Sequence, residues 1–313
     1  MLCGAFMIDR RCTTITLTYM HDQSTYRIRI DLAYDGTAYH GWATQPGLAT
    51  IQGTVEDGLA TIFRQPIATT VAGRTDAGVH AANQVIHFDI PAALWEKLPG
   101  NHPMRPAETA MVTKLNGVLA KTSGAIHIRK AQIVPAGFDA RFSPIARSYR
   151  YRIAMDEFDP LTRHFTYHHR KPLDMNRMVE EISGIEGMHD FSAFCKPRPG
   201  ATTIRTLQEF RATREETVMT LHLTADAFCH HMVRALVGAL LRVGDGSREP
   251  GWLRSRLTNP VRDSDMVLAP AHGLILDYVM YPPDDQLAAR AAQTRAKRDP
   301  RMLPCDQSAG PLR

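Results

Sequence analysis

The ten residues AGRTDAGVHA, Ala72–Ala81, bring reactive side chains together in a short, glycine-containing stretch. Arg74 and Asp76 stand one residue apart between two glycines, and His80 follows four residues after the carboxylate. Glycine lets a backbone turn tightly or pass close to a ligand because it has no Cβ. The pattern therefore predicts a turn that presents the carboxylate of Asp76.

A second stretch, AFCHHMVRALVGALLRVGDG, has the apolar spacing of a helix that starts near Phe228 and is buried on most sides. His230, Arg234 and Gly238 fall at i, i+4 and i+8, on a common line of this helix. An arginine in so apolar a helix needs an anionic partner, since an unpaired buried charge is costly. That partner is either a structural carboxylate or a functional one in a cleft between two halves of the protein.

The same stretch raises the question of a metal, because His230 and His231 follow Cys229. Neighbouring residues on a helix point about 100° apart and do not readily bind one ion, so we expect no metal site. The sequence has no CxxC pair, GxSxG elbow, GxxxxGK[ST] loop or GxGxxG fingerprint. These observations predict chemistry without a metal or cofactor, centred on one carboxylate.

Composition is that of an ordinary globular protein of about two domains, with 313 residues, 44% of them apolar. No apolar run approaches the ~20 residues of a membrane-spanning helix. The five cysteines are odd in number and scattered, which favours reduced thiols and a cytoplasmic location over a disulfide framework. The net charge of +5 is modest and becomes informative only if the basic residues gather on one surface.

Two predicted strands carry arginine on one face. In TYRIRIDLAY, from Thr25, apolar residues alternate with Arg27 and Arg29, and RSYRYRI repeats this with Arg150 and Arg152. Such alternation indicates a half-buried strand with one polar face. Cross-strand ion pairs on a solvated face and a surface for nucleic acid both explain this pattern, and the sequence does not separate them.

Strands and helices follow one another without strict βαβ alternation, which predicts an α+β fold. We expect a disordered N-terminal extension at 1–23, an N-terminal half at 24–145 that contains the Asp76 loop, and a C-terminal half at 146–283. Residues 284–313 are predicted to be a frayed helix or a disordered basic tail, dispensable for chemistry. A polar stretch, Pro91–Pro106, is expected to be a surface insertion.

Six segments, in this order, resemble the tRNA pseudouridine synthase A (TruA) family. They are YDGTAYHGWATQPGLATIQGTVE, AGRTDAGVHAANQVIHF, FDARFSPIARSYRYRI, DFSAF, FCHHMVRALVGALLRVGDG and APAHGLILDYVMY. The resemblance covers roughly Tyr26 to Tyr281, and its GRTDAGVHA motif is highly specific. The chain departs from the family pattern at Ala43, where glutamine is common, and at Asp139, where histidine is common.

The resemblance implies two pseudo-symmetric α/β-sandwich halves, ferredoxin-like in topology, whose sheets join into one central antiparallel sheet. It implies an isomerase that converts uridine to pseudouridine at positions 38, 39 and 40 in the anticodon stem-loop of tRNA. The partners implied are tRNA and a second copy of the chain in a homodimer, with no DNA and no membrane. The alternatives are a non-catalytic tRNA-binding or chaperone protein and a synthase that acts on other uridines.

The family motifs also assign candidate roles to individual residues. Asp76 corresponds to the nucleophile, and Arg234 is the expected ion-pair partner that keeps it charged. Arg74 would help extrude the target nucleotide or hold its phosphate, and the ring of Tyr149 would stack on the flipped base and assist proton transfer. Two further substrate-site residues are expected: Leu274, packing against the base, and His80, stabilising the loop by hydrogen bonds.

Overall fold

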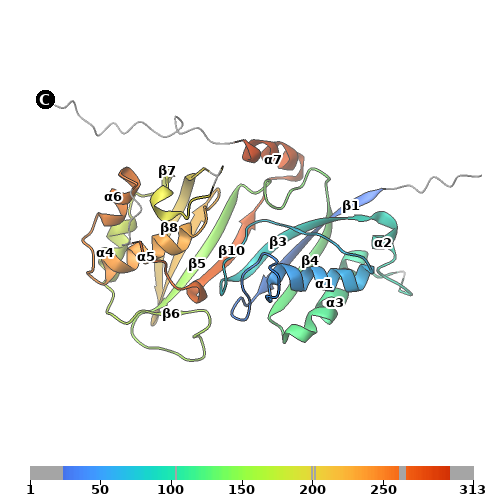
Figure 1. Ribbon diagram of the computed structural model, residues 1–313, viewed down its shortest axis with the longest axis horizontal. Coiled ribbons are helices and arrows are strands. Elements are labelled where there is room, and N and C mark those ends of the chain that lie inside the picture. The colour runs from blue at the N-terminus through green and yellow to red at the C-terminus, as the bar shows by residue number, and fades with distance from the viewer. Residues whose placement is uncertain (1–23, 103, 199, 201, 261–265, 297–313) are drawn as a thin grey trace, which may run out of the picture.

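The computed structural model describes residues 24–296 except 103, 199, 201 and 261–265. One ten-stranded, mostly antiparallel sheet forms the centre of this part of the chain, with helices packed at both ends (Figure 1). In sheet order the strands are β4 (Ile126–Val134), β1 (Thr25–Tyr34), β3 (His80–Pro91), β10 (Leu274–Met280), β5 (Ala146–Ala154), β9 (Val218–Ala225), β8 (Ile204–Glu215) and β7 (Gly187–Asp190). Two short strands lie outside this order: β2 (Thr70–Val71) pairs with β3, and β6 (Tyr167–His168) pairs with β5. The predicted α+β class with a single central sheet is confirmed.

The end of the sheet formed by β4, β1 and β3 is covered by α1 (Ile51–Phe63) and α3 (Ala107–Leu119). Thr50 caps α1, because its hydroxyl accepts a hydrogen bond from the amide of Gly53 at 3.3 Å. Alternate residues of β1, among them Ile28 and Ile30, are fully buried. Each such side chain contributes about 1.5–3 kcal/mol through burial.

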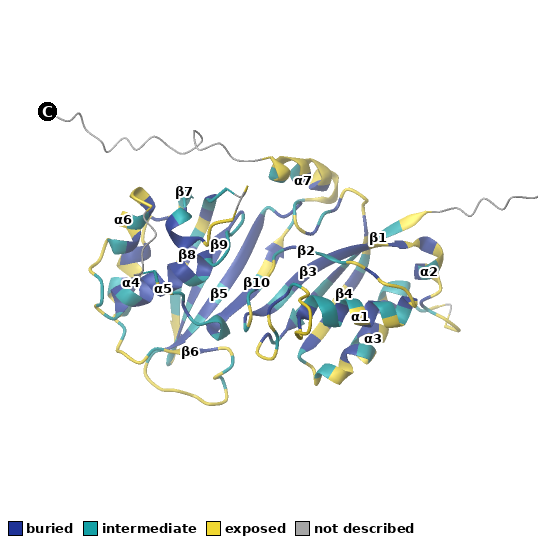
Figure 2. Cartoon of the chain, viewed as in Figure 1, coloured by how far each residue is buried: buried dark blue, intermediate teal, exposed yellow. Residues whose placement is uncertain are grey.

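At the other end of the sheet, α4 (Met175–Ile182), α5 (Met232–Gly244) and α6 (Trp252–Thr258) pack together. Helix α5 is buried along most of its length (Figure 2). It begins at Met232, four residues later than the predicted start near Phe228. His230 therefore lies outside the helix and does not share a helical line with Arg234.

The two ends of the sheet meet where β3 lies parallel to β10, with Ile275 opposite His80 and Leu276 opposite Ala81. On its other side β10 is antiparallel to β5, where Leu276 lies opposite Tyr149. Because β3 follows directly after the Asp76 loop, this junction brings the loop close to the strand that carries Tyr149.

Most of the arginines on the polar faces of β1 and β5 have carboxylate partners. These pairs are Arg27 with Asp89 at 2.7 Å, Arg29 with Asp31 at 2.7 Å and Arg150 with Asp277 at 2.5 Å. The guanidinium of Arg152 donates to the hydroxyl of Thr166. These strands fit the interpretation of a face with ion pairs, so any surface that attracts an anion has to be sought elsewhere.

Two segments that were expected to be peripheral contain packed helices. In the Pro91–Pro106 stretch, α2 (Ala92–Glu96) buries Trp95. Beyond residue 283, α7 (Leu287–Arg295) buries Leu287 and Ala291. The expected N-terminal extension, 1–23, and residues 297–313 lie outside the described residues.

Cys195 and Cys229 form a disulfide, with their Cα atoms 5.7 Å apart. For these two residues the expectation of reduced thiols is wrong. Their separation of 34 positions is not a recognisable motif, and only the fold brings them together. None of the helices in the described part of the chain combines the length and the apolar character that crossing a membrane requires.

Candidate active site

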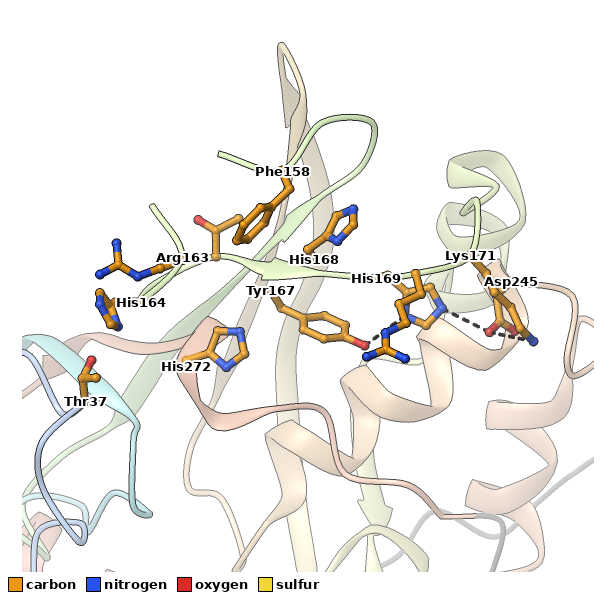
Figure 3. Close-up of a pocket in the computed structure, with 12 residues that line it drawn as sticks. Thr37, Phe158, Arg163, His164, Tyr167, His168, His169, Lys171, Asp245 and His272 are labelled. Carbon is orange, nitrogen blue, oxygen red and sulfur yellow. Dashed lines mark hydrogen bonds and ion pairs between the residues drawn. The ribbon is translucent and has the colours of Figure 1, made fainter. Parts of the chain in front are cut away.

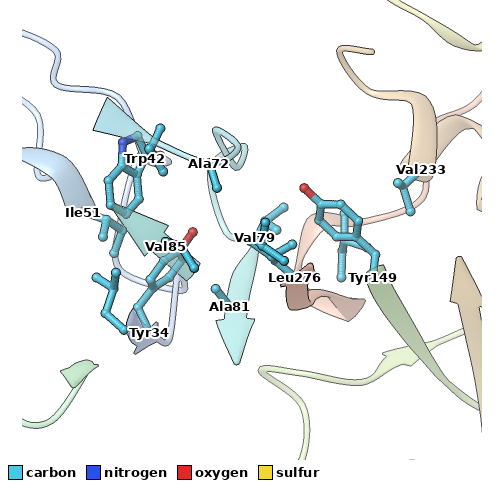
Figure 4. Close-up of a cluster of buried hydrophobic side chains, with 14 of the residues drawn as sticks. Tyr34, Trp42, Ile51, Ala72, Val79, Ala81, Val85, Tyr149, Val233 and Leu276 are labelled. Atoms are coloured by element: carbon cyan, nitrogen blue, oxygen red, sulfur yellow. The ribbon is translucent and has the colours of Figure 1, made fainter. Parts of the chain in front are cut away.

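A cleft of about 1050 Å³ opens beside the junction of β3, β10 and β5. Its lining includes the Asp76 loop, Tyr149 of β5, the segment just before α5 and the first residue of β10. Figure 4 shows the apolar floor next to it, where Tyr149 and Leu276 lie opposite each other on neighbouring strands. Segments from both halves of the sequence thus meet in one cavity.

The turn that carries Asp76 is held by backbone hydrogen bonds. The amide of Val79 donates to the carbonyl of Asp76 at 3.1 Å, and the amide of Trp42 donates to the carbonyl of Thr75 at 3.0 Å. Gly78 adopts a left-handed conformation, with φ of 76°, which favours glycine. The turn predicted from the sequence is therefore present.

Asp76 is ion-paired with Arg234. Nη1 of Arg234 lies 3.2 Å from Oδ2 of Asp76, and the two side chains are 18% and 27% exposed. The guanidinium is also anchored by Nε, which donates to the carbonyl of Ala269 at 2.8 Å. Of the two partners predicted for this buried arginine, the structure provides a carboxylate in a cleft. It leaves this carboxylate partly exposed, so a substrate can reach it.

Two histidines that were not among the predicted site residues also contact Asp76. Nε2 of His230 and Nε2 of His231 each lie 3.5 Å from an oxygen of Asp76. His231 caps α5 with a left-handed φ of 71°, so the 100° rule for neighbouring helical residues does not apply to the pair. Burial and the neighbouring His231 lower the pKa of His230, which favours a neutral ring at pH 7.

The donor atoms of Asp76, His230 and His231 lie within 4.8 Å of one another, a spacing that could hold a metal ion. Arg234 competes for the same carboxylate at 3.2 Å, and the surrounding cleft is rich in basic residues. A cation would have to enter against this positive charge. The arrangement therefore favours an ion-paired carboxylate over a metal ligand.

Tyr149 lines the cleft and is 7% exposed. Its ring packs edge-on against Phe228, with centroids 5.1 Å apart. A Cβ on Gly73 would lie 3.9 Å from the Tyr149 hydroxyl, so the start of the Asp76 turn lies beside this hydroxyl. Burial raises the pKa of Tyr149 to about 12, which keeps the phenol neutral at physiological pH.

The remaining predicted site residues divide between the cleft and its surroundings. Arg74 is exposed at the cleft, and Leu274, the first residue of β10, is buried in its wall. His80 is not part of the cleft lining. Its Nδ1 lies 3.0 Å from both the Gly36 amide and a carboxylate oxygen of Asp35, so it braces a neighbouring loop.

Arg147 is a site residue that sequence reasoning missed. Its buried guanidinium donates to the carbonyls of Ala72, at 2.9 Å, Asp226, at 3.0 Å, and Arg141, at 2.7 Å. Ala72 immediately precedes the first glycine of the Asp76 turn, so Arg147 fixes the base of this turn. The signal was present in RSYRYRI, but alternation alone does not show that its first arginine is buried.

Positive charge is concentrated in the cleft. Its lining contains two acidic residues, Asp76 and Asp226, and the following basic ones: Arg74, Arg141, Arg147, Lys196, Arg198, Arg205, Arg234 and Arg290. Such an excess on concave walls attracts polyanions. This is the basic surface that the net charge alone did not reveal.

A second hollow of about 830 Å³ lies near β6 (Figure 3). Its lining is rich in histidine and includes Arg163, Arg170 and Lys171. Its one carboxylate, Asp245, lies 3.1 Å from His169 and 3.6 Å from Lys171. This carboxylate is already engaged by two neighbours, so the cleft that contains Asp76 is the better candidate for the active site.

Comparison with known proteins identifies the family of this chain. A family model described as tRNA pseudouridine synthase matches residues 182–282. Proteins named tRNA pseudouridine synthase A are 48% identical in Leifsonia xyli, covering 89% of this chain and 99% of the relative, and 48% identical in Frankia casuarinae, covering 88% and 96%. The relative from Mycobacterium leprae is 44% identical, covering 87% and 95%. The fold, the site and these similarities define a pseudouridine synthase. More narrowly, the chain belongs to the tRNA pseudouridine synthase A family.

Proposed function

We propose that this member of the family isomerises uridine to pseudouridine at positions 38, 39 and 40 in the anticodon stem-loop of tRNA, with Asp76 as nucleophile. The observation that carries the proposal is the partly exposed Asp76 carboxylate, paired with Arg234 at 3.2 Å inside a basic cleft. An ionised carboxylate can form a transient covalent adduct and divide one difficult step into two easier ones.

The reaction needs only the substrate and the protein. The bond between C1′ and N1 of the nucleotide breaks, the base rotates, and a new bond joins C1′ to C5. The bond that the Asp76 carboxylate forms to the substrate breaks again before the product leaves, so the carboxylate is regenerated. The proton leaves C5, and N1 ends with a proton, so the product is an isomer of the substrate. Atoms and electrons balance without an external oxidant, reductant or water, which agrees with a site built from one carboxylate and its partners.

The neighbouring side chains have distinct roles in this proposal. Arg234 pairs with the carboxylate at 3.2 Å and fixes its direction, because the guanidinium is also anchored on the carbonyl of Ala269. The neutral phenol of Tyr149 stacks on the extruded base and donates a hydrogen bond, or relays a proton by accepting one as it releases its own. Leu274 supplies an apolar contact to the base, and the exposed Arg74 binds a phosphate or occupies the place the base leaves.

The RNA partner accounts for the charge of the cleft. A uridine in a stem has to leave the stack before a side chain can reach it, and backbone contacts to basic residues help to hold the opened RNA. We further propose a homodimer, in which one tRNA contacts both subunits, and a cytoplasmic location, where tRNA is processed.

The test is to map pseudouridine in tRNA transcripts that carry uridine at positions 38–40 and elsewhere. We expect modification at those three positions with the wild-type protein and none with Asp76→Asn. Modification confined to other uridines would favour a synthase of different site choice. Tight binding without any modification would favour the tRNA chaperone.

A further inference from the structure

Helix α7 is a fixed part of the cleft wall. Two of its own residues, Leu287 and Ala291, are buried. A Cβ on Gly137 would lie only 2.8 Å from the Ala288 side chain. Ser143 donates to the carbonyl of Leu287 at 3.1 Å. The helix is therefore packed closely onto the loop between β4 and β5, although the family model ends at residue 282, before α7 begins.

The end of α7 is attached to the same loop by charge. Arg295 pairs with Asp139 at 2.6 Å, and its guanidinium lies over the ring of Phe142 at 4.9 Å. This arginine thus has a structural role. Arg290, one turn earlier, lines the cleft, and its Nε donates to the carbonyl of Pro144 at 3.2 Å. That bond orients the guanidinium and leaves its two terminal nitrogens for a ligand.

Arg290 lines the same cleft as Arg141 and Arg147, and Arg147 donates to the carbonyl of Arg141 at 2.7 Å. Among the residues that the structure describes, none of the three forms a salt bridge with a carboxylate, and Arg147 donates only to backbone carbonyls. Burial lowers the pKa of Arg147, and the nearby positive charge of Arg290 adds to this effect. Like charges that gather on one wall are stabilised by an anion from outside.

We propose that Arg290 of α7, together with Arg141, forms a binding site for a backbone phosphate of the tRNA substrate, while the buried Arg147 adds positive charge behind them and keeps its own hydrogen bonds to backbone carbonyls. Guanidinium groups match the geometry of phosphate oxygens, and the cleft places these three side chains beside the catalytic turn. Arg147 connects the two, because it also holds the carbonyl of Ala72 at the base of the turn. The inference deepens the proposed function and rests on it.

The test measures tRNA affinity of the full-length protein over a series of salt concentrations, with Arg290→Gln, Arg290→Lys and the control Arg129→Gln. Arg129 is an exposed arginine of β4, outside the cleft. The control removes the same charge from the protein as a whole. Circular dichroism and thermal unfolding confirm that each variant is folded.

We expect Arg290→Gln to raise Kd roughly tenfold, the loss of one charge-assisted hydrogen bond. The slope of log Kd against log salt concentration should fall by about 1, because one phosphate contact is lost. Arg290→Lys should restore the slope, since the charge is kept. The proposal would be overturned if Arg290→Gln had the same Kd and slope as Arg129→Gln. It would also be overturned if Arg290→Gln bound tRNA more weakly with an unchanged slope, because that result indicates a structural role for the bond to Pro144. A wild-type protein that binds tRNA but modifies no uridine would instead contradict the proposed function.

Discussion

Oδ2 of Asp76 lies 3.2 Å from Nη1 of Arg234, although 158 positions separate the two residues in the sequence. Asp76 is held by the turn before β3, and Arg234 by α5 and the carbonyl of Ala269. Neither half of the chain can form this ion pair alone. The geometry of the site therefore depends on how closely α5 packs against its neighbouring segments.

Gly238 of α5 allows one of these close contacts, and its replacement should disturb the site from a distance. A Cβ at Gly238 would lie 1.9 Å from the carbonyl oxygen of Val267, so Gly238→Ala has to push away the segment that also anchors Arg234. We expect a loss of about 1–3 kcal/mol in the free energy of unfolding. Turnover should fall as well. Urea unfolding and pseudouridine formation measure the two effects.

Gly117 provides the matched control for this substitution. It also lies within a helix, α3, but apart from its chain neighbours and the backbone of its own helix no described atom lies within 4 Å of the position of its Cβ. Gly117→Ala should raise the free energy of unfolding by about 0.5–1 kcal/mol through helix propensity. Equal effects of the two substitutions would show that the contact with Val267 does not constrain α5.

Arg234→Gln removes the charge that faces Asp76 while keeping a polar side chain. We expect kcat/KM to fall by about 10²–10³-fold, as for other lost electrostatic partners in enclosed sites. Arg242→Gln, two turns further along α5 and outside the cleft lining, is the control and should change the rate little. A fall of less than threefold for Arg234→Gln would mean that another group keeps the carboxylate functional.

Local sequence patterns singled out these two residues separately, and the family resemblance then predicted that they pair. Arg234 interrupts an apolar helix, and Asp76 lies in a glycine-flanked turn, so each has a signal within a few residues. Patterns of this kind depend only on neighbours in the chain, and the fold retains them.

Features that depend on distant packing were not predicted. His230 and His231 reach Asp76 because α5 starts late and His231 adopts a left-handed conformation. The spacing of apolar residues in the sequence indicates neither feature. The long strand β8 was missed, and the disulfide between Cys195 and Cys229 joins positions with no recognisable spacing. Helix α7 has few large apolar residues and gains its place by packing onto the loop around Asp139.

Buried tyrosines make stability sensitive to alkaline pH. Burial raises the pKa of Tyr34, Tyr151 and Tyr281, and raises that of Tyr149 to about 12. In the unfolded chain these phenols ionise near pH 10, whereas in the folded protein they stay neutral to higher pH. Their contribution to the free energy of unfolding is therefore complete below pH 10 and is lost as the pH rises toward 12. The loss is about 1.4 kcal/mol per pH unit for each tyrosine.

Urea unfolding between pH 8 and 11.5 measures this dependence. Tyr149→Phe should reduce the slope of the free energy of unfolding against pH by the contribution of one tyrosine. Tyr278→Phe, at an exposed position, should leave this slope unchanged. A stability that stays constant up to pH 11.5 would show that these phenols ionise as readily in the folded protein as in the unfolded one.

The most direct test of the account is the turnover of Asp76→Asn. This substitution keeps the shape of the side chain and removes its charge, so tRNA affinity should be equal or greater in a cleft dominated by arginines. The measurement is the release of tritium from tRNA labelled at C5 of uridine, together with Kd for the same tRNA. We predict a fall in turnover of at least about 10⁴-fold with Kd within threefold of wild type. Turnover within tenfold of wild type would contradict the assignment of Asp76 as the nucleophile.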